Sequence, residues 1–138
     1  MPFYAFLHPI WLIGIFILGI YTAQIGLRKK SLVKALPLHR HRNLGWVFLI
    51  LIALGAILGK TINNSLIARN IHLKMSGHGP LGFIIIILVA LGIIFGQVGL
   101  QNRKKFAAIL KWHPWLNILA LGLLTAQTFM GILALLGI

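Results

Sequence analysis

Histidine is the side chain in this protein that is best suited to hold a cofactor. The 138 residues include six His but no Asp, no Glu and no Cys. Without carboxylates or thiols, the chain cannot build a paired-acid hydrolase, a carboxylate–histidine nucleophile triad, a carboxylate cage for metal ions or an iron–sulfur cluster. A neutral imidazole remains a good ligand for a transition metal, and in particular for haem iron.

Four of the His are followed, 18 residues later, by glycine. These pairs are His8 and Gly26, His41 and Gly59, His78 and Gly96, and His113 and Gly131. On an α-helix 18 residues make five turns, so both members of a pair lie on one face, about 27 Å apart along the axis. The two remaining residues, His39 and His72, are followed at this offset by Ile57 and Ala90. The offset therefore favours the first set as ligands, without excluding His39 or His72.

Antiparallel helices would bring these residues together at two levels. We expect the outer level to hold His8, His78, Gly59 and Gly131, and the inner level to hold His41, His113, Gly26 and Gly96. At each level two helices then provide an imidazole, and the other two helices carry a glycine. This arrangement suits a flat macrocycle with two axial nitrogens, so we expect two b-type haems. The alternative interpretation of the glycines is close packing of membrane helices through small residues.

Basic residues flank both levels. Arg40, Arg42 and Lys111 lie beside the inner pair, and Arg69 and Lys74 are near the outer pair. Such side chains would make charge-assisted hydrogen bonds to haem propionates. Snorkelling towards lipid phosphate explains the same residues without haem.

Proline follows two of the proposed ligands directly, as His8-Pro9 and His113-Pro114. The residue before proline tends to leave helical geometry, and proline is favoured at the first position of a helix. We therefore expect these two His at helix caps.

The elements that must carry these residues are membrane helices. Apolar residue types make up 59 % of the chain and the mean hydropathy is +0.98. Four stretches lack Lys and Arg, and each reaches the ~17 apolar residues that a helix needs to cross a bilayer. The spans are expected at about residues 3–27, 41–59, 78–100 and 113–137. They predict one all-α domain, an integral membrane four-helix bundle with up-down topology.

The two halves of the chain share a pattern that predicts a duplicated two-helix hairpin. Residues 19–27 read GIYTAQIGL and residues 92–100 read GIIFGQVGL, and basic residues follow each. A duplication would make the first and third helices equivalent, and likewise the second and fourth. Low complexity in glycine-rich membrane helices is the alternative explanation.

The basic residues also predict how the chain is oriented. Ten of the 13 Lys and Arg fall between the first and second spans or between the third and fourth. The positive-inside rule places these connections inside, and both termini and the middle connection on the outer or lumenal side. Charges that flank membrane spans favour anionic lipid as a partner over nucleic acid, which needs a solvated basic face.

Together these residues resemble the four-helix core of cytochrome b561-like proteins, in particular a small family of cyanobacteria and plastids. The matching motifs are His8-Pro9, His39-Arg40-His41 ahead of Gly45, Asn63-Asn64 in the middle connection, His78-Gly79-Pro80-Leu81-Gly82, and His113 with Asn117 and the 127–131 stretch. The resemblance implies two b-type haems, ligated by His8 with His78 and by His41 with His113. It also implies single-electron transfer across a bacterial inner or thylakoid membrane, with a quinone or a protein as donor and acceptor.

Other functions stay open on sequence grounds. The chain could be a small structural or pigment-binding subunit of a larger photosynthetic complex, with His holding chlorophyll, and it could form a homo-oligomer. A transporter or channel is disfavoured, because no span contains the charged residues that ion and proton paths use. Ascorbate or ferric-reductase activity is not implied, because the substrate motifs of the ascorbate-using relatives are missing.

Overall fold

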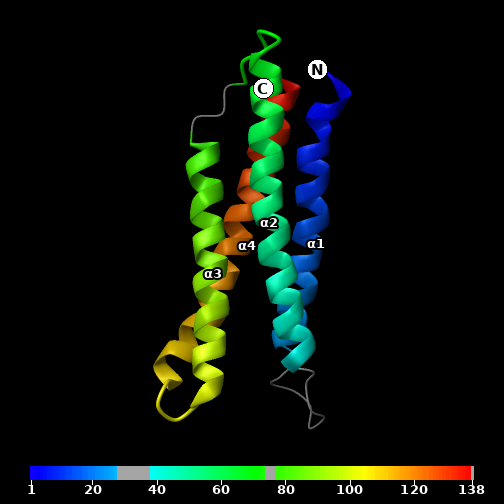
Figure 1. Cartoon of the computed structure of the whole chain (residues 1–138). Coiled ribbons are helices and arrows are strands. Elements are labelled where there is room, and N and C mark those ends of the chain that lie inside the picture. Colours follow the sequence, from blue (N-terminus) through cyan, green and yellow to red (C-terminus); the bar gives the residue numbers. More distant parts are fainter. Residues whose placement is uncertain (28–37, 74–76, 138) are drawn as a thin grey trace.

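The chain folds into four long α-helices preceded by a short 3-10 helix (Figure 1). The computed structural model describes residues 1–27, 38–73 and 77–137. The elements are η1 (Phe3–Phe6), α1 (Leu7–Leu27), α2 (Leu38–Ile67), α3 (His78–Gln101) and α4 (Ala107–Leu136). The described residues contain no strand, so the expected all-α architecture is confirmed.

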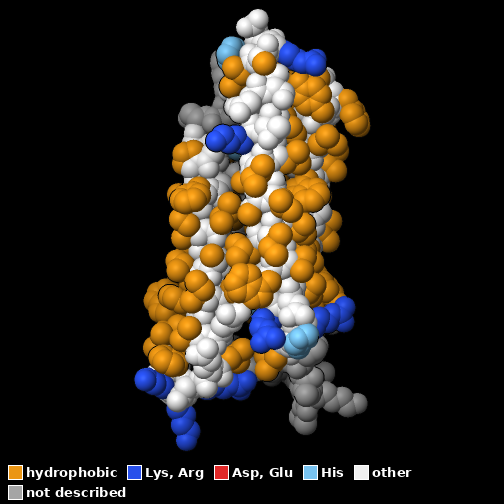
Figure 2. All heavy atoms as spheres, viewed as in Figure 1, with side chains coloured by type: hydrophobic (Ala, Val, Ile, Leu, Met, Phe, Trp, Pro, Cys, Tyr) orange, Lys and Arg blue, Asp and Glu red, His pale blue; other side chains and the backbone are white. Residues whose placement is uncertain are grey.

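All four helices are long and apolar enough to cross a membrane. Large apolar side chains cover the visible face of the bundle between its two ends (Figure 2). Ile17, Ile57 and Phe83, for example, are 62, 63 and 65 % exposed. A protein in water rarely exposes such a continuous apolar surface, whereas a lipid bilayer solvates it. In lipid, a helix also satisfies its backbone hydrogen-bonding groups within its own segment. The protein is therefore an integral membrane protein.

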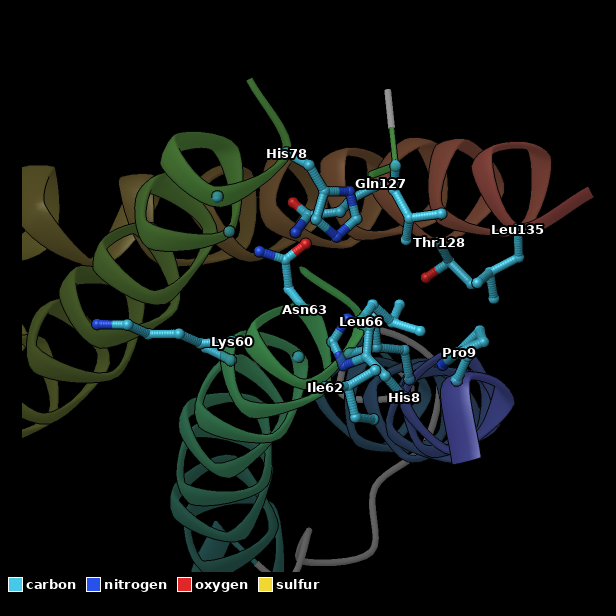
Figure 3. A pocket seen from close by; sticks show the side chains of 18 of the residues that line it. His8, Pro9, Lys60, Ile62, Asn63, Leu66, His78, Gln127, Thr128 and Leu135 are labelled. Atoms are coloured by element: carbon cyan, nitrogen blue, oxygen red, sulfur yellow. The ribbon is translucent and has the colours of Figure 1, made fainter. Parts of the chain in front are cut away.

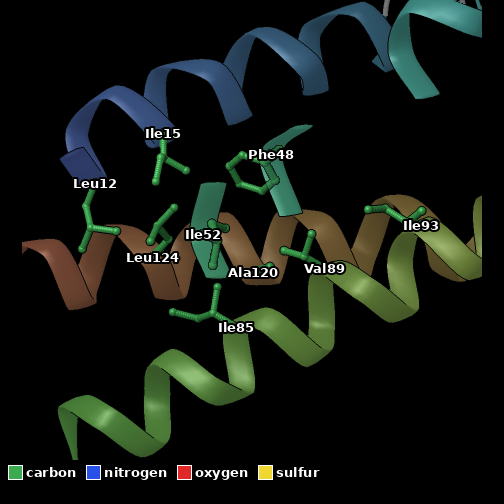
Figure 4. Close-up of a cluster of buried hydrophobic side chains, with 9 residues drawn as sticks. All are labelled: Leu12, Ile15, Phe48, Ile52, Ile85, Val89, Ile93, Ala120 and Leu124. Atoms are coloured by element: carbon green, nitrogen blue, oxygen red, sulfur yellow. The ribbon is translucent and has the colours of Figure 1, made fainter. Parts of the chain in front are cut away.

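The helices pack in a ring, in which each contacts its neighbours in sequence and α4 closes the ring against α1. This leaves α1 opposite α3, and α2 opposite α4, across the interior. Buried apolar side chains from all four helices fill the middle of the bundle (Figure 4): Leu12, Ile15, Phe48, Ile52, Ile85, Val89, Ile93, Ala120 and Leu124. This apolar layer separates the two ends of the interior, where the histidines lie.

Glycines bring α3 and α4, the most extensive helix pair, into close contact. A Cβ at Gly99 would lie 2.8 Å from Cβ of Leu110 and 3.2 Å from its backbone Cα. Gly92 likewise faces the side-chain amide of Asn117. Small residues thus let the second hairpin pack backbone against side chain, as is common in membrane helices.

The helices extend beyond the spans predicted from the sequence. α2 continues past residue 59 to Ile67, and α4 begins at Ala107 instead of near 113. Hydropathy detects the apolar part of a helix, but the hydrogen-bonded backbone continues into the polar turns on either side. The connections between helices are correspondingly shorter than the sequence suggests.

Several residues expected in connections therefore lie on helices. The Asn63-Asn64 pair, placed in the middle connection on sequence grounds, belongs to α2. Arg40 and Arg42 are also in α2, and Lys111 is in α4. Their positions are consequently set by helix geometry, which matters for the sites described below.

The expectation that His8 and His113 form helix caps is wrong for both, because His8 is the second residue of α1 and His113 lies well inside α4. Pro114 lies inside α4, and Pro9 lies in the first turn of α1. Proline removes one backbone donor, but in an apolar surrounding the remaining hydrogen bonds keep the segment helical. His113 is therefore an interior residue of its helix.

Both chain ends and the α2–α3 connection lie at one end of the bundle, called the outer end below (Figure 1). The opposite, inner end carries most of the described basic residues: Arg40, Arg42, Arg103, Lys104, Lys105 and Lys111. Figure 2 shows Lys and Arg side chains gathered at that end. Five further cations, Arg28, Lys29, Lys30, Lys34 and Lys74, lie outside the described residues.

We predict that Gly99→Ala destabilises the protein by about 1–3 kcal/mol, because the new methyl group would overlap Leu110 and press on its backbone. The matched control is Gly14→Ala, since no described atom lies within 4 Å of a Cβ at Gly14 and alanine favours helix. Unfolding of the detergent-solubilised protein, followed by circular dichroism, measures the difference. Equal unfolding midpoints for the two variants would contradict the tight contact between α3 and α4.

Candidate functional site

His8 and His78 meet at the outer end of the bundle interior. They come from α1 and α3, which face each other across the ring, and their ring centroids are 6.1 Å apart with an interplanar angle of 70°. His8 also lies against Gly59 of α2, where a Cβ would be 2.8 Å from Cε1 of the ring. Gly131 of α4 takes the equivalent place beside His78, at 3.4 Å. The four residues expected at the outer level therefore lie together.

His41 and His113 form the corresponding pair at the inner end. They come from α2 and α4, and their ring centroids are 5.9 Å apart with an interplanar angle of 85°. A Cβ at Gly26 would be 2.9 Å from Cε1 of His41, and a Cβ at Gly96 would be 2.8 Å from Nδ1 of His113. The two-level placement predicted by the 18-residue offset is confirmed.

The glycines at both levels make room for imidazole rings. In each hairpin the His of one helix packs on the glycine of the other, so α1 with α2 and α3 with α4 make the same reciprocal contact. The sequence predicts these glycines at the edges of a cofactor, but the groups that contact them in this structure are the His rings themselves. The same contact in both hairpins is what a duplicated unit would produce.

Hydrogen bonds determine which nitrogen of the inner rings carries the proton. Nδ1 of His41 is 3.0 Å from the carbonyl oxygen of Thr22, and Nδ1 of His113 is 2.6 Å from that of Gly92. Each carbonyl lies one turn before the facing glycine, where the missing side chain lets the ring reach the oxygen. Because a carbonyl can only accept, Nδ1 is the donor and Nε2 of the neutral ring keeps its lone pair. Histidine ligands of metals are commonly held by such a hydrogen bond.

The outer rings lack this support. Within the described part of the chain, Nδ1 of His8, Nδ1 of His78 and Oε1 of Gln127 are buried without a hydrogen-bond partner. The backbone of Gly55, one turn before Gly59, interacts with the His8 ring but does not reach hydrogen-bond geometry with Nδ1. Buried polar atoms without partners are destabilising and rare in proteins. Their concentration at this end indicates a site for a group that the chain itself does not supply.

The outer pair borders a cavity of about 980 Å³. Figure 3 shows the side chains of His8, His78, Asn63 and Gln127 around its polar part. Its apolar walls come from Leu12, Ile62, Leu66, Phe83, Ile86 and Leu135. A cavity of several hundred cubic ångströms with apolar walls and a few convergent polar groups is typical of a small-molecule or cofactor site.

The basic residues predicted beside the inner pair have different surroundings. Arg40 donates a hydrogen bond of 2.7 Å to Oη of Tyr21 and lies over the same ring, 5.6 Å from its centroid. Arg42 lines a smaller hollow together with Arg103. Lys111 is exposed on α4. Of the three predicted residues, Arg40 is thus held by an aromatic ring of α1.

Of the two basic residues predicted at the outer end, Arg69 does not line the cavity. Arg69 lies over the ring of Tyr4, 5.5 Å from its centroid, and Lys74 lies outside the described residues. The cavity is lined instead by Lys60 and Asn63, two residues that the sequence did not single out as site residues. Both follow Gly59 of α2 within about one helical turn. The sequence alone does not place them near the site, because it assigns this stretch to a connection and not to a helix.

His39 and His72 belong to neither pair. His39 is exposed in the first turn of α2, and His72 is exposed at the rim of the outer cavity. The geometry therefore supports His41 and His78 over these neighbours, whereas their role as ligands stays a prediction.

We predict that His41 and His113 carry their proton on Nδ1, because each Nδ1 faces a backbone carbonyl. Nitrogen chemical shifts of protein labelled with ¹⁵N-histidine distinguish the two tautomers. Gly96→Ala places a methyl group where the His113 ring lies, so His113 should lose its single tautomer while His41 keeps it. Gly14→Ala serves as the control, and an inner pair protonated on Nε2 in the wild type would contradict the hydrogen bonds.

No protein-family model, no curated protein and no solved structure matches this chain. The case for a function therefore rests on the two histidine pairs, their glycines and the outer cavity.

Proposed function

We propose that this protein is a b-type di-haem membrane cytochrome, similar to cytochrome b561-like proteins, that carries single electrons between partners at the two membrane faces. The spacing of the histidine pairs carries the proposal. Two imidazoles on opposite sides of one metal ion, each bound at about 2 Å, have ring centroids about 6 Å apart. The measured separations are 6.1 Å for the outer pair and 5.9 Å for the inner pair. The helices thus already stand at the distance that such a site requires.

A site with two protein ligands favours a metal whose remaining ligands belong to a bound cofactor. The described residues contain no group of three or more His, Cys, Asp or Glu that could hold a metal ion, and the whole sequence lacks carboxylates and thiols. A structural zinc site uses four protein ligands and a catalytic one uses three. Haem supplies the equatorial nitrogens of its porphyrin and accepts two axial imidazoles, which matches a site built from one His pair.

The surroundings of the two pairs fit haem in different ways. At the outer end, the cavity of about 980 Å³ offers apolar walls and unpartnered imidazole nitrogens on His8 and His78. At the inner end, backbone carbonyls hold both rings through Nδ1, so Nε2 would be the nitrogen that binds the iron. Lys111 is a basic residue suited to a propionate at the inner end, and among the described residues Lys60 is the basic side chain that lines the outer cavity.

When bound, haem iron supplies reversible one-electron oxidation and reduction. The chain's own residues hold the group, orient the imidazoles and keep water away. The two levels are 18 residues apart on each helix, or about 27 Å along the axis, which is close to the thickness of the hydrocarbon core. The apolar layer between them is built from side chains without ionisable groups. Each level therefore lies near one face, where a quinone or a protein can serve as donor or acceptor.

The basic residues at the inner end of the bundle give the proposed orientation. The positive-inside rule places the inner end, with its basic residues, on the cytoplasmic or stromal side of a bacterial inner or thylakoid membrane. Both termini and the outer cavity then face the outside or the lumen. The outer level would exchange electrons with a partner on that side.

We predict about two haems per chain in protein produced with ample haem. His41→Ala and His78→Ala should each remove one haem, because each leaves its pair with a single imidazole. His39→Ala and His72→Ala are matched controls, since each removes a nearby exposed His that belongs to neither pair, and both should keep two haems. Reduced-minus-oxidised spectra together with a haem assay measure the content, and circular dichroism shows whether each variant keeps its helices.

A colourless protein would overturn this proposal. Chlorophyll in an organic extract of the purified protein would instead assign the His pairs to a pigment-binding subunit. Unchanged spectra in the His41 and His78 variants would move the ligands elsewhere.

The orientation can be tested separately, because the chain has no native Cys. Ser65→Cys places a single thiol at the outer end and Lys104→Cys places one at the inner end, both at exposed positions. In intact bacterial cells, a membrane-impermeant maleimide should label the first variant and not the second. The opposite pattern would reverse the proposed orientation, and labelling after lysis is the control for reactivity.

A further inference from the structure

The inner end of the groove between α2 and α3 contains a hollow that the histidine pairs do not line. It measures about 290 Å³ and is bordered by Leu38, His39, Arg42, Leu100 and Arg103. The first three residues lie at the start of α2, and the last two lie at the end of α3 and just after it. Figure 2 shows a gap between these helices at this level, next to basic and histidine side chains. Two arginines from different parts of the chain therefore border one space.

In the part of the chain that the structure describes, the side chains of Arg42 and Arg103 have no partner, as is also true of Lys60, Lys104 and Lys111. Three basic side chains lie over aromatic rings, namely Arg40, Arg69 and Lys105. Within the described ranges, Arg42 and Arg103 make no hydrogen bond, ion pair or ring contact. The sequence contains no Asp or Glu that could neutralise them. Two like charges beside one hollow repel each other, and an anion placed between them would remove the repulsion.

We propose that this hollow binds the headgroup of an anionic phospholipid, with the phosphate between Arg42 and Arg103. The planar guanidinium forms two parallel hydrogen bonds to phosphate oxygens, which makes arginine the preferred residue for such a site. Leu38 and Leu100, which are 39 and 36 % exposed, provide apolar surface on either side for the lipid's first acyl carbons. The ligand is thus expected to be charged at one end and apolar at the other.

His39 offers a third polar side chain at the same place. It lines the hollow together with Arg42 and Arg103. A ring N–H group of His39 would add to the hydrogen bonds available to a phosphate.

The position of the hollow favours a lipid over other anions. Its residues lie at the start of the predicted span 41–59 and at the end of the predicted span 78–100. This is the level of the lipid headgroups. Basic pockets between membrane helices on the cytoplasmic side are known places for anionic headgroups. A free phosphate would leave the leucine walls uncovered. An acidic protein would instead use the broader set of cations at the inner end, such as Lys104 and Lys105.

The test is to count bound lipids by native mass spectrometry of the purified full-length protein. Titration with phosphatidylglycerol and with phosphatidylcholine should show one tightly held phosphatidylglycerol and a clear preference for it. The double variant Arg42→Gln with Arg103→Gln should weaken this binding by at least about tenfold, because it removes two charge-assisted contacts. Lys104→Gln with Lys105→Gln is the matched control, since it removes the same charge from the same end without touching the hollow.

Several outcomes would overturn the proposal. Equal weakening in the Lys104/Lys105 variant would show a diffuse surface-charge effect, and equal affinity for inorganic phosphate or glycerol phosphate would show a site for a soluble anion. Phosphatidylglycerol binding that disappears when haem is added would assign the hollow to a haem propionate. If the double variant does not fold by circular dichroism, His39→Gln and Arg103→Gln are each tested alone, and unchanged affinity in both contradicts the site.

Discussion

An imidazole ring inside a lipid bilayer loses the water that would satisfy its nitrogens, so it needs a place where protein polar groups are within reach. In this bundle glycine provides that place. Each His of the two pairs packs on a glycine of the neighbouring helix, and at the inner end the ring reaches the backbone carbonyl one turn away. Because each hairpin contains two such contacts at opposite ends, its helices must be antiparallel and in one register. The levels, the pairing across the ring and the apolar layer between them all depend on this contact.

The two levels share the contact between His and Gly but differ in the hydrogen bonding of their imidazole rings. At the inner end, Nδ1 of His41 and of His113 is hydrogen bonded and the rings are held in place. At the outer end, Nδ1 of His8 and of His78 is buried without a partner, next to the large cavity. A sequence repeat can reproduce the His–Gly contact in both hairpins, but the large cavity is lined by His8 and His78 and not by His41 or His113. The proposed cofactor sites are therefore alike in their ligands and different in their surroundings.

The absence of Asp and Glu explains how the basic residues are arranged. Without carboxylates, the faces of tyrosine and phenylalanine take the place of ion-pair partners for Arg40, Arg69 and Lys105. The remaining cations need anions from outside the chain, such as lipid phosphates or a cofactor's carboxylates. The net charge of +13 suits a protein at a membrane surface, where anionic lipid can neutralise it.

The sequence by itself determined the number of helices, their membrane character and the two levels of His and Gly, because hydropathy and the helical period are local properties. It also selected His41 over His39 and His78 over His72 as members of the pairs, although ligation stays a prediction. Only the tertiary structure decided what fills the space beside each glycine, and it placed imidazole rings there. It also placed Arg42 and Arg103 at the border of one hollow and put Asn63 in the wall of the outer cavity. These contacts join residues from different helices, and no period along one helix specifies which neighbour it will face once the bundle packs.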